Sequence, residues 1–177
     1  DMAPEAFSAW NFARYINTVA GAGKREYPLP MYVNVWLIEG VERAGQWPSG
    51  GVTEHVIDIL KAASPMIYIL APDIYLPQFE QVCRTFARNG NPLFIPETGQ
   101  NPANAWMAFT QLNALCYSPF GVDGMQSDSP LARAYGLINS LSGAIAEAQG
   151  KPDAIKLITL GDGENPGRVA MGDYVMD

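Results

Sequence analysis

This sequence of 177 residues is short of basic charge, of cysteine and of histidine. Its 11 Lys and Arg residues stand against 18 Asp and Glu residues, which gives a net charge of −7 at pH 7. Because no basic patch is available to neutralise phosphates, we expect neither nucleic acid nor an anionic membrane as a partner. The two cysteines, Cys83 and Cys116, and the single histidine, His55, lack the spacing of a zinc or disulfide framework. We therefore predict buried free thiols and a surface or packing role for His55, and we expect no metal or organic cofactor.

Long apolar runs are missing as well, and none approaches the roughly 20 residues that cross a membrane as a helix. Apolar residues nevertheless make up 48% of the chain and charged residues 16%, a globular composition that is lean in charge. A chain of this length can bury one real core, so a single main domain is expected.

Short apolar runs alternate with stretches of helical periodicity. The predicted strands are 31–37, 66–71, 93–95 and 114–117, and the predicted helices are 4–22, 52–63, 78–88, 103–112 and 131–149. Gly21 and Gly23 are expected to end the first helix, whose aromatic residues are expected to pack against the fold. Residues 38–51 are a predicted loop, and 155–160 and 168–174 are predicted strands around a turn at 161–163. The alternation predicts a parallel sheet with helices on its faces.

Two α/β architectures fit this order of elements. An open, flavodoxin-like doubly wound sheet would be complete at this length. A (β/α)8 TIM barrel typically needs about 250 residues, so this chain would form its second half. Polar or aromatic residues lie at the end of every predicted strand, and this favours the half barrel because a site at the top of a barrel draws on all strand ends. These residues are Asn34, Trp36, Asp73, Tyr75, Glu97, Tyr117 and Phe120.

Glu97 stands out among them. It follows the apolar run Leu93–Ile95 and lies between Pro96 and Thr98. A carboxylate at the carboxyl end of a buried parallel strand occupies the place where α/β barrels carry their chemistry. From this stretch alone, a solvated turn residue is an equal alternative. Tyr75, at the neighbouring strand end, is a candidate hydrogen-bond donor to it, with a core tyrosine as the alternative.

With these strand ends in view, the sequence resembles the glycoside hydrolases of the (β/α)8 clan, above all bacterial β-galactosidase-like enzymes of families 35 and 42. The resemblance spans nearly the whole chain and is specific in its combination of motifs. The segments that carry it are 9–15 (AWNFARY), 27–37 (YPLPMYVNVWL), 48–51 (PSGG), 70–75 (LAPDIY), 94–98 (FIPET) and 118–121 (SPFG).

The resemblance implies that the four strands are the fifth to eighth of a barrel and that Glu97 is the catalytic nucleophile. It also implies two domains, with residues 1–150 as half of the catalytic barrel and 151–177 as the start of an appended β-rich segment. Asn34 and Asp73 are candidate ligands of sugar hydroxyls, or else capping and turn residues. Trp36, Tyr117 and Phe120 are candidate apolar platforms for a sugar ring, or else core aromatics.

The family's second carboxylate, the general acid/base, is usually an Asn-Glu pair at the end of the fourth strand, and this sequence has no such pair. Retaining glycosidases need both carboxyl groups, about 5–5.5 Å apart. The resemblance thus implies a retaining hydrolase of terminal β-galactosides or similar β-glycosides whose acid/base lies outside this chain. A β-xylosidase or an arabinosidase would look similar. It also slightly favours a bacterial periplasmic or extracellular setting over the cytoplasm.

A non-catalytic half barrel that folds and oligomerises is the alternative from another class. A half barrel has two open strand edges and an unfilled interior. We therefore expect the isolated chain to be inactive or very weak, and to pair with a missing N-terminal half barrel or with a second copy of itself as a homodimer.

Overall fold

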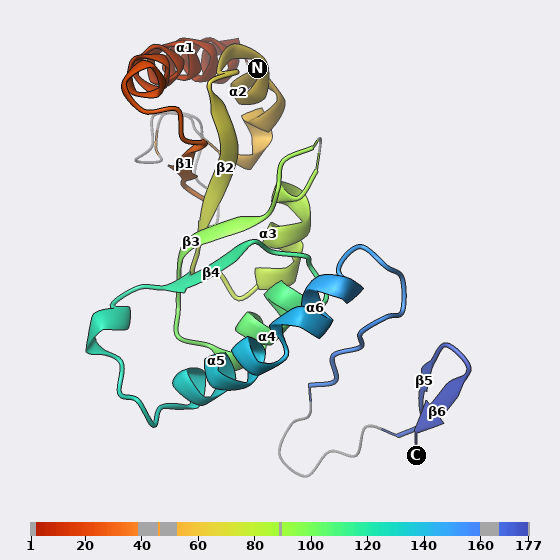
Figure 1. Ribbon diagram of the computed structural model, residues 1–177. Coiled ribbons are helices and arrows are strands. Elements are labelled where there is room, and N and C mark those ends of the chain that lie inside the picture. The colour runs from red at the N-terminus through yellow and green to blue at the C-terminus, as the bar shows by residue number, and fades with distance from the viewer. Residues whose placement is uncertain (1–2, 39–45, 47–52, 89, 160–166, 177) are drawn as a thin grey trace.

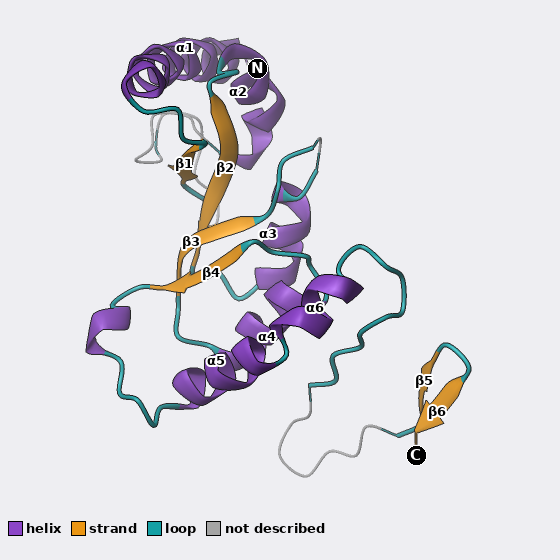
Figure 2. Ribbon diagram, viewed as in Figure 1, coloured by secondary structure: helices purple, strands orange, loops and turns teal. Residues whose placement is uncertain are grey.

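The computed structural model describes residues 3–38, 46, 53–88, 90–159 and 167–176. Strands and helices alternate along the chain as predicted (Figures 1 and 2). The elements are α1 (Ala3–Glu26), β1 (Met31–Val35), η1 (Glu54–Val56), α2 (Ile57–Ala63), β2 (Ile67–Ile74), α3 (Phe79–Phe86), β3 (Phe94–Thr98), α4 (Pro102–Thr110), β4 (Cys116–Pro119), η2 (Val122–Gly124), α5 (Pro130–Ser140), α6 (Ser142–Ala148), β5 (Val169–Met171) and β6 (Tyr174–Met176). Among the described helices, none combines the length and the apolar character needed to cross a membrane.

The first four strands form one sheet in the order β1-β2-β3-β4, and all neighbouring pairs are parallel. This sheet with its flanking helices confirms the α/β class. Right-handed crossovers between strands that follow one another in this way place their helices on the same face. A doubly wound sheet instead reverses its strand order at one point, and no such reversal occurs within the described sheet.

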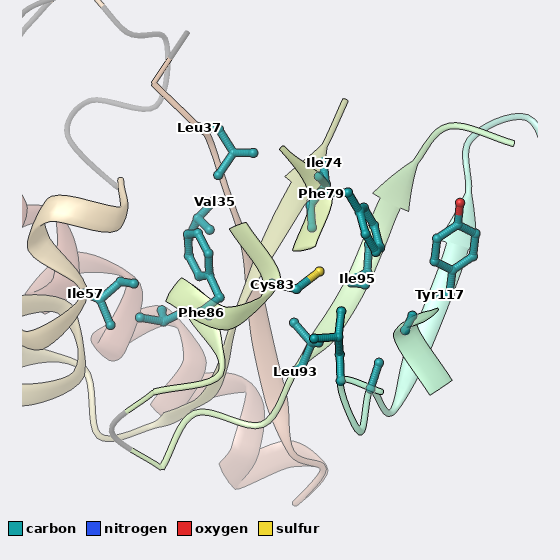
Figure 3. Packing of buried hydrophobic residues seen from close by; sticks show 14 of the residues in the cluster. Val35, Leu37, Ile57, Ile74, Phe79, Cys83, Phe86, Leu93, Ile95 and Tyr117 are labelled. Atoms are coloured by element: carbon teal, nitrogen blue, oxygen red, sulfur yellow. The ribbon is translucent and has the colours of Figure 1, made fainter. Parts of the chain in front are cut away.

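One face of the sheet is covered by helices and holds the hydrophobic core. Figure 3 shows Phe79, Cys83 and Phe86 of α3 packed over side chains from the strands, among them Val35, Ile74 and Ile95. Ala105 and Ala108 of α4 and Leu131 and Ile138 of α5 belong to the same buried cluster. We call this the helix-covered face.

The opposite face carries the side chains of alternate residues, and we call it the open face. The rings of Tyr32 on β1 and Phe94 on β3 lie there, with their centroids 4.8 Å apart. Because β2 lies between these strands and neighbouring strands are about 4.8 Å apart, the two rings must lean toward each other over β2. Their contact indicates that the sheet curves toward its open face.

Asn91 holds β2 and β3 together where their backbones diverge. The two strands pair in register at Asp73–Glu97 and Ile74–Thr98, near their carboxyl ends. Farther back, the buried Asn91 amide accepts a hydrogen bond from the Leu70 N–H (3.0 Å) and donates one to the Leu70 carbonyl (2.9 Å). It also donates to the carbonyl of Phe86 (2.9 Å). The side chain thus takes the place of a strand partner for Leu70. From the sequence, Asn91 is seen only as a turn residue before Pro92.

The prediction that Gly21 and Gly23 end the first helix is wrong, because α1 continues through both to Glu26. A Cβ on Gly23 would lie 3.0 Å from the Met31 side chain, and one on Gly21 would lie 3.6 Å from that of Met66. The glycines therefore let the helix approach the start of β1 and β2. Tertiary packing outweighs their low helix propensity here.

The aromatic residues of α1 do not pack as expected. The helix buries the small residues Ala9, Ala13 and Ala20, and it packs against α2. Phe12, Tyr15 and Val19, at positions i, i+3 and i+7, remain on the surface, with Tyr15 68% and Val19 55% exposed. We call these three residues the α1 stripe. Alanines allow the close approach of two helices, and the large side chains are left beside that contact.

The helix predicted over 131–149 is two helices, α5 and α6, separated at Leu141, while Ser129 caps α5 by accepting a hydrogen bond from Ala132 N–H. In the tail, the described residues 155–159 form no strand, which corrects the strand predicted at 155–160. The strand predicted at 168–174 is interrupted, because β5 ends at Met171 and pairs with β6 after a turn at Gly172 and Asp173. The turn predicted at 161–163 and nearly all of the loop predicted at 38–51 lie outside the described residues.

Candidate active site

A β-bulge sets the direction of Glu97. Between β3 and β4, Ile95 pairs with Tyr117 and Thr98 pairs with Pro119. The two pairs are three residues apart along β3 but two residues apart along β4, so β3 contains one extra residue. The extra residue shifts the alternation of side chains. Without it, Glu97 would share the helix-covered face with Ile95, two residues earlier. With it, Glu97 lies on the open face, and Pro96, which has no N–H to donate to a ladder, falls within the bulge.

The register of the sheet brings two further polar side chains beside it. Asp73 on β2 is the direct partner of Glu97 on β3. Asn34 on β1 is the partner of Ala71, which lies two residues before Asp73 and therefore points to the same face. Tyr75 follows Asp73 by two residues and continues this alternation just beyond the end of β2. We call Asn34, Asp73, Tyr75 and Glu97 the polar row.

Two hydrogen bonds hold the polar row. The Tyr75 hydroxyl donates to Glu97 Oε1 at 2.9 Å, as its position at the neighbouring strand end had suggested. The Asn34 amide Nδ2 donates to Asp73 Oδ1 at 2.8 Å. Each carboxylate thus has one neutral donor from another strand or strand end. A third contact secures the scaffold, because the buried Thr98 hydroxyl donates to the Ile74 carbonyl at 2.7 Å.

The two carboxylates influence each other. Desolvation and the negative charge of Glu97 raise the pKa of Asp73 to about 6, although the Asn34 hydrogen bond opposes this. Since this pKa lies above the usual value of an aspartate, ionisation of Asp73 costs stability. Protonated Asp73 therefore contributes to the free energy of unfolding. This contribution is complete below about pH 4 and is lost as the pH rises through about 6. Desolvation, the hydrogen bond to Glu97 and the two nearby negative charges raise the pKa of Tyr75 to about 12, so its hydroxyl keeps its proton at neutral pH.

The predicted aromatic platforms fall in different places. Trp36 follows β1 and continues the open-face alternation of Asn34, with part of its ring exposed. Phe120 follows β4 and is 69% exposed, and its N–H donates to the Thr98 carbonyl at 2.9 Å. Tyr117 belongs to the core instead. It is 4% exposed, its ring lies 6.0 Å from that of Phe79, and its hydroxyl donates to the Gly99 carbonyl at 2.7 Å.

Asn34 and Tyr75 of the polar row are exposed, whereas Asp73 and Glu97 are partly buried. A cavity of about 420 Å³ lies beside α3, lined by residues such as Leu37, Leu76 and Gln81, and no member of the polar row lines it. Within the described residues, no three His, Cys, Asp or Glu side chains gather as a metal site would require. The polar row itself supplies two carboxylates, one amide and one phenol, a set suited to hydroxyl ligands and to nucleophilic or proton-transfer chemistry.

Other predicted features lie away from this surface. His55 is about half exposed, and its Nδ1 lies 3.7 Å from Oε1 of the buried Glu5. Cys83 and Cys116 are free thiols, and Cys83 is buried as predicted, whereas Cys116 is only partly buried. Burial raises the pKa of Cys83 to about 12, so this thiol is a core group rather than a nucleophile.

Comparison with protein-family models and with curated proteins gives no match for this chain. The basis for a role of the polar row is therefore its geometry, together with the resemblance of the strand-end motifs to those of (β/α)8 glycoside hydrolases.

Proposed function

We propose that this chain is the nucleophile-bearing half of a retaining glycoside hydrolase that cleaves terminal β-galactosides or similar β-glycosides. The observation that carries the proposal is the bulge in β3, which directs Glu97 onto the open face and into contact with the Tyr75 hydroxyl. Bulges beside active sites commonly re-aim one side chain in this way. The resemblance of 94–98 to the nucleophile motif of β-galactosidase-like enzymes supplies the identity of the reaction.

In the proposed reaction, a Glu97 oxygen attacks the anomeric carbon and forms a glycosyl ester, while the aglycone oxygen leaves with a proton from an acid outside this chain. Water then attacks the ester, gives up a proton to the same outside group, and regenerates Glu97. Tyr75 donates its hydrogen bond to Glu97 Oε1 and orients the carboxylate for attack. Asn34 and Asp73 would bind sugar hydroxyls, and Trp36 and Phe120 would offer apolar surface at the rim.

The half-barrel architecture has two supports. The strand order is sequential, and the buried cluster occupies one face, as in a (β/α)8 barrel. The contact between Tyr32 and Phe94 joins alternate strands across the open face, and the interior layers of such barrels are built from side chains of alternate strands. The open face would then be the barrel interior. An open surface at the polar row would become a pocket when the remaining strands are present.

The experiment is hydrolysis of 2,4-dinitrophenyl β-D-galactopyranoside by the purified chain. This substrate needs little acid assistance because dinitrophenolate leaves readily. We expect a slow burst of dinitrophenolate in the wild type, with amplitude near one per active chain, and its loss in Glu97→Gln. Glu80→Gln, an exposed carboxylate that pairs with Arg84 on α3, is the matched control and should keep the burst. A burst that persists in Glu97→Gln would contradict the proposal.

The second candidate is a half barrel that associates without catalysis. It is favoured by the exposed α1 stripe and by the edge of β1, whose neighbour in the described sheet is β2 alone. The missing N-terminal half barrel or a second copy of the chain would cover both. A folded chain that sediments as a dimer and gives no burst would favour this candidate. A stable monomer at high concentration would count against both the association and the half barrel.

A further inference from the structure

Asp73 is the one carboxylate of the polar row whose role the proposed nucleophilic attack does not use. It lies directly opposite Glu97 in register, on the neighbouring strand. Neighbouring strands are about 4.8 Å apart, so a sugar whose anomeric carbon lies at Glu97 extends over Asp73 or over β4 on the other side. The polar side chains of the row lie on the Asp73 side.

The hydrogen bonds of Asp73 leave part of the pair open to a ligand. Asn34 donates its amide Nδ2 to Asp73 Oδ1. Within the described residues, neither Asp73 Oδ2 nor Asn34 Oδ1 takes part in a hydrogen bond with another side chain or backbone group. On the open face, the Asn34 side chain is exposed and Asp73 is partly buried. The Asn34 hydrogen bond orients the carboxylate and leaves Asp73 Oδ2 and Asn34 Oδ1 as possible acceptors for a ligand.

We propose that Asp73, held in place by Asn34, accepts a hydrogen bond from a sugar hydroxyl beside Glu97, and that the ionisation of Asp73 makes sugar affinity depend on pH. The inference rests on the proposed function, because it takes the ligand to be a neutral pyranose. Asp73 is a positioning residue here, since it binds the sugar without touching the bond that is cleaved.

The groups that face Asp73 decide the direction of the effect. Glu97 on β3 is the charged neighbour, Tyr75 stays neutral up to about pH 12, and Asn34 on β1 does not titrate. Desolvation and the charge of Glu97 raise the pKa of Asp73 to about 6. Above that pH the carboxylate is an ionised acceptor, and hydrogen bonds to charged groups are stronger than those to neutral ones. Sugar affinity should therefore increase as the pH rises through about 6.

The test measures binding of isopropyl 1-thio-β-D-galactopyranoside, an uncharged thioglycoside, by the full chain with NMR titrations between pH 4.5 and 7.5. In the wild type, we expect the dissociation constant to fall roughly 10-fold across this range. In Asp73→Asn, the constant should be nearly independent of pH and close to the low-pH value of the wild type. Asp153→Asn, at an exposed aspartate that follows α6 and lies in the same surface hollow as Thr110 and Asn113, is the matched control and should behave as the wild type.

Glu97→Gln provides an independent check. Because the Glu97 charge raises the pKa of Asp73, its removal should move the midpoint of the binding curve to lower pH. Asp73→Asn should also remain folded and gain thermal stability at pH 7, since it removes a carboxylate whose ionisation opposes folding.

A pH dependence that survives in Asp73→Asn would overturn the inference, and so would a folded wild type that binds no thiogalactoside at any pH. The two proposals can fail separately. If thiogalactoside binds with a pH dependence that requires Asp73 but no covalent chemistry occurs at Glu97, the hydrolase proposal is rejected and the sugar site is retained. If a burst depends on Glu97 but the pH dependence of binding does not require Asp73, the hydrolase proposal is retained and the role of Asp73 is rejected.

Discussion

The two faces of the parallel sheet differ in how their side chains affect stability. On the helix-covered face, Ile95 and Tyr117 are buried among the side chains of α3 and the other helices. On the open face, Phe94 and Tyr32 touch each other, and the polar row holds two carboxylates that repel each other. One face thus contributes stability, and the other carries an electrostatic cost. A cost of this kind at a pair of partly buried carboxylates is typical of a functional site.

The first way to sharpen this comparison is Ile95→Ala on the helix-covered face. Ile95 is fully buried in the core cluster, and truncation leaves a cavity there. We expect the free energy of unfolding to fall by about 2–5 kcal/mol. Urea unfolding followed by circular dichroism measures it, and a loss below about 1 kcal/mol would contradict the assignment of the core to this face.

The neighbouring substitution Phe94→Ala on the open face should have a smaller effect. Phe94 is half-buried and its described ring contact is with Tyr32, so we expect a loss of about 1–2 kcal/mol in the same assay. The order of the two variants is the informative result, because both residues lie on β3 and differ in the face they occupy. A Phe94→Ala effect larger than that of Ile95→Ala would show that the open face is part of the core.

The strands and helices themselves were predictable from the sequence, since short apolar runs and helical periodicity are local signals. Glu97 and its donor Tyr75 were predictable too, because both follow apolar runs at neighbouring strand ends. The placement of Tyr117 was not, because its side chain alternates to the helix-covered face, and only the register reveals this.

Four further features depend on contacts between distant parts of the chain. The extension of α1 through Gly21 and Gly23 depends on its approach to Met31 and Met66. The role of Asn91 depends on the divergence of β2 and β3. The pairing of Asp73 with Glu97 depends on strand register, and the direction of Glu97 depends on a bulge. An Ile-Pro-Glu-Thr sequence contains proline as a signal of irregularity but does not specify which face the glutamate takes.

The most direct test of the nucleophile is covalent trapping with 2,4-dinitrophenyl 2-deoxy-2-fluoro-β-D-galactopyranoside. The fluorine slows hydrolysis of the glycosyl ester, so one turnover is enough for detection by intact mass and peptide mapping. Our account predicts a single fluoroglycosyl group on Glu97, absent from Glu97→Gln and formed at a normal rate in Glu80→Gln. A label on another residue, or a folded chain that stays unlabelled, would contradict it.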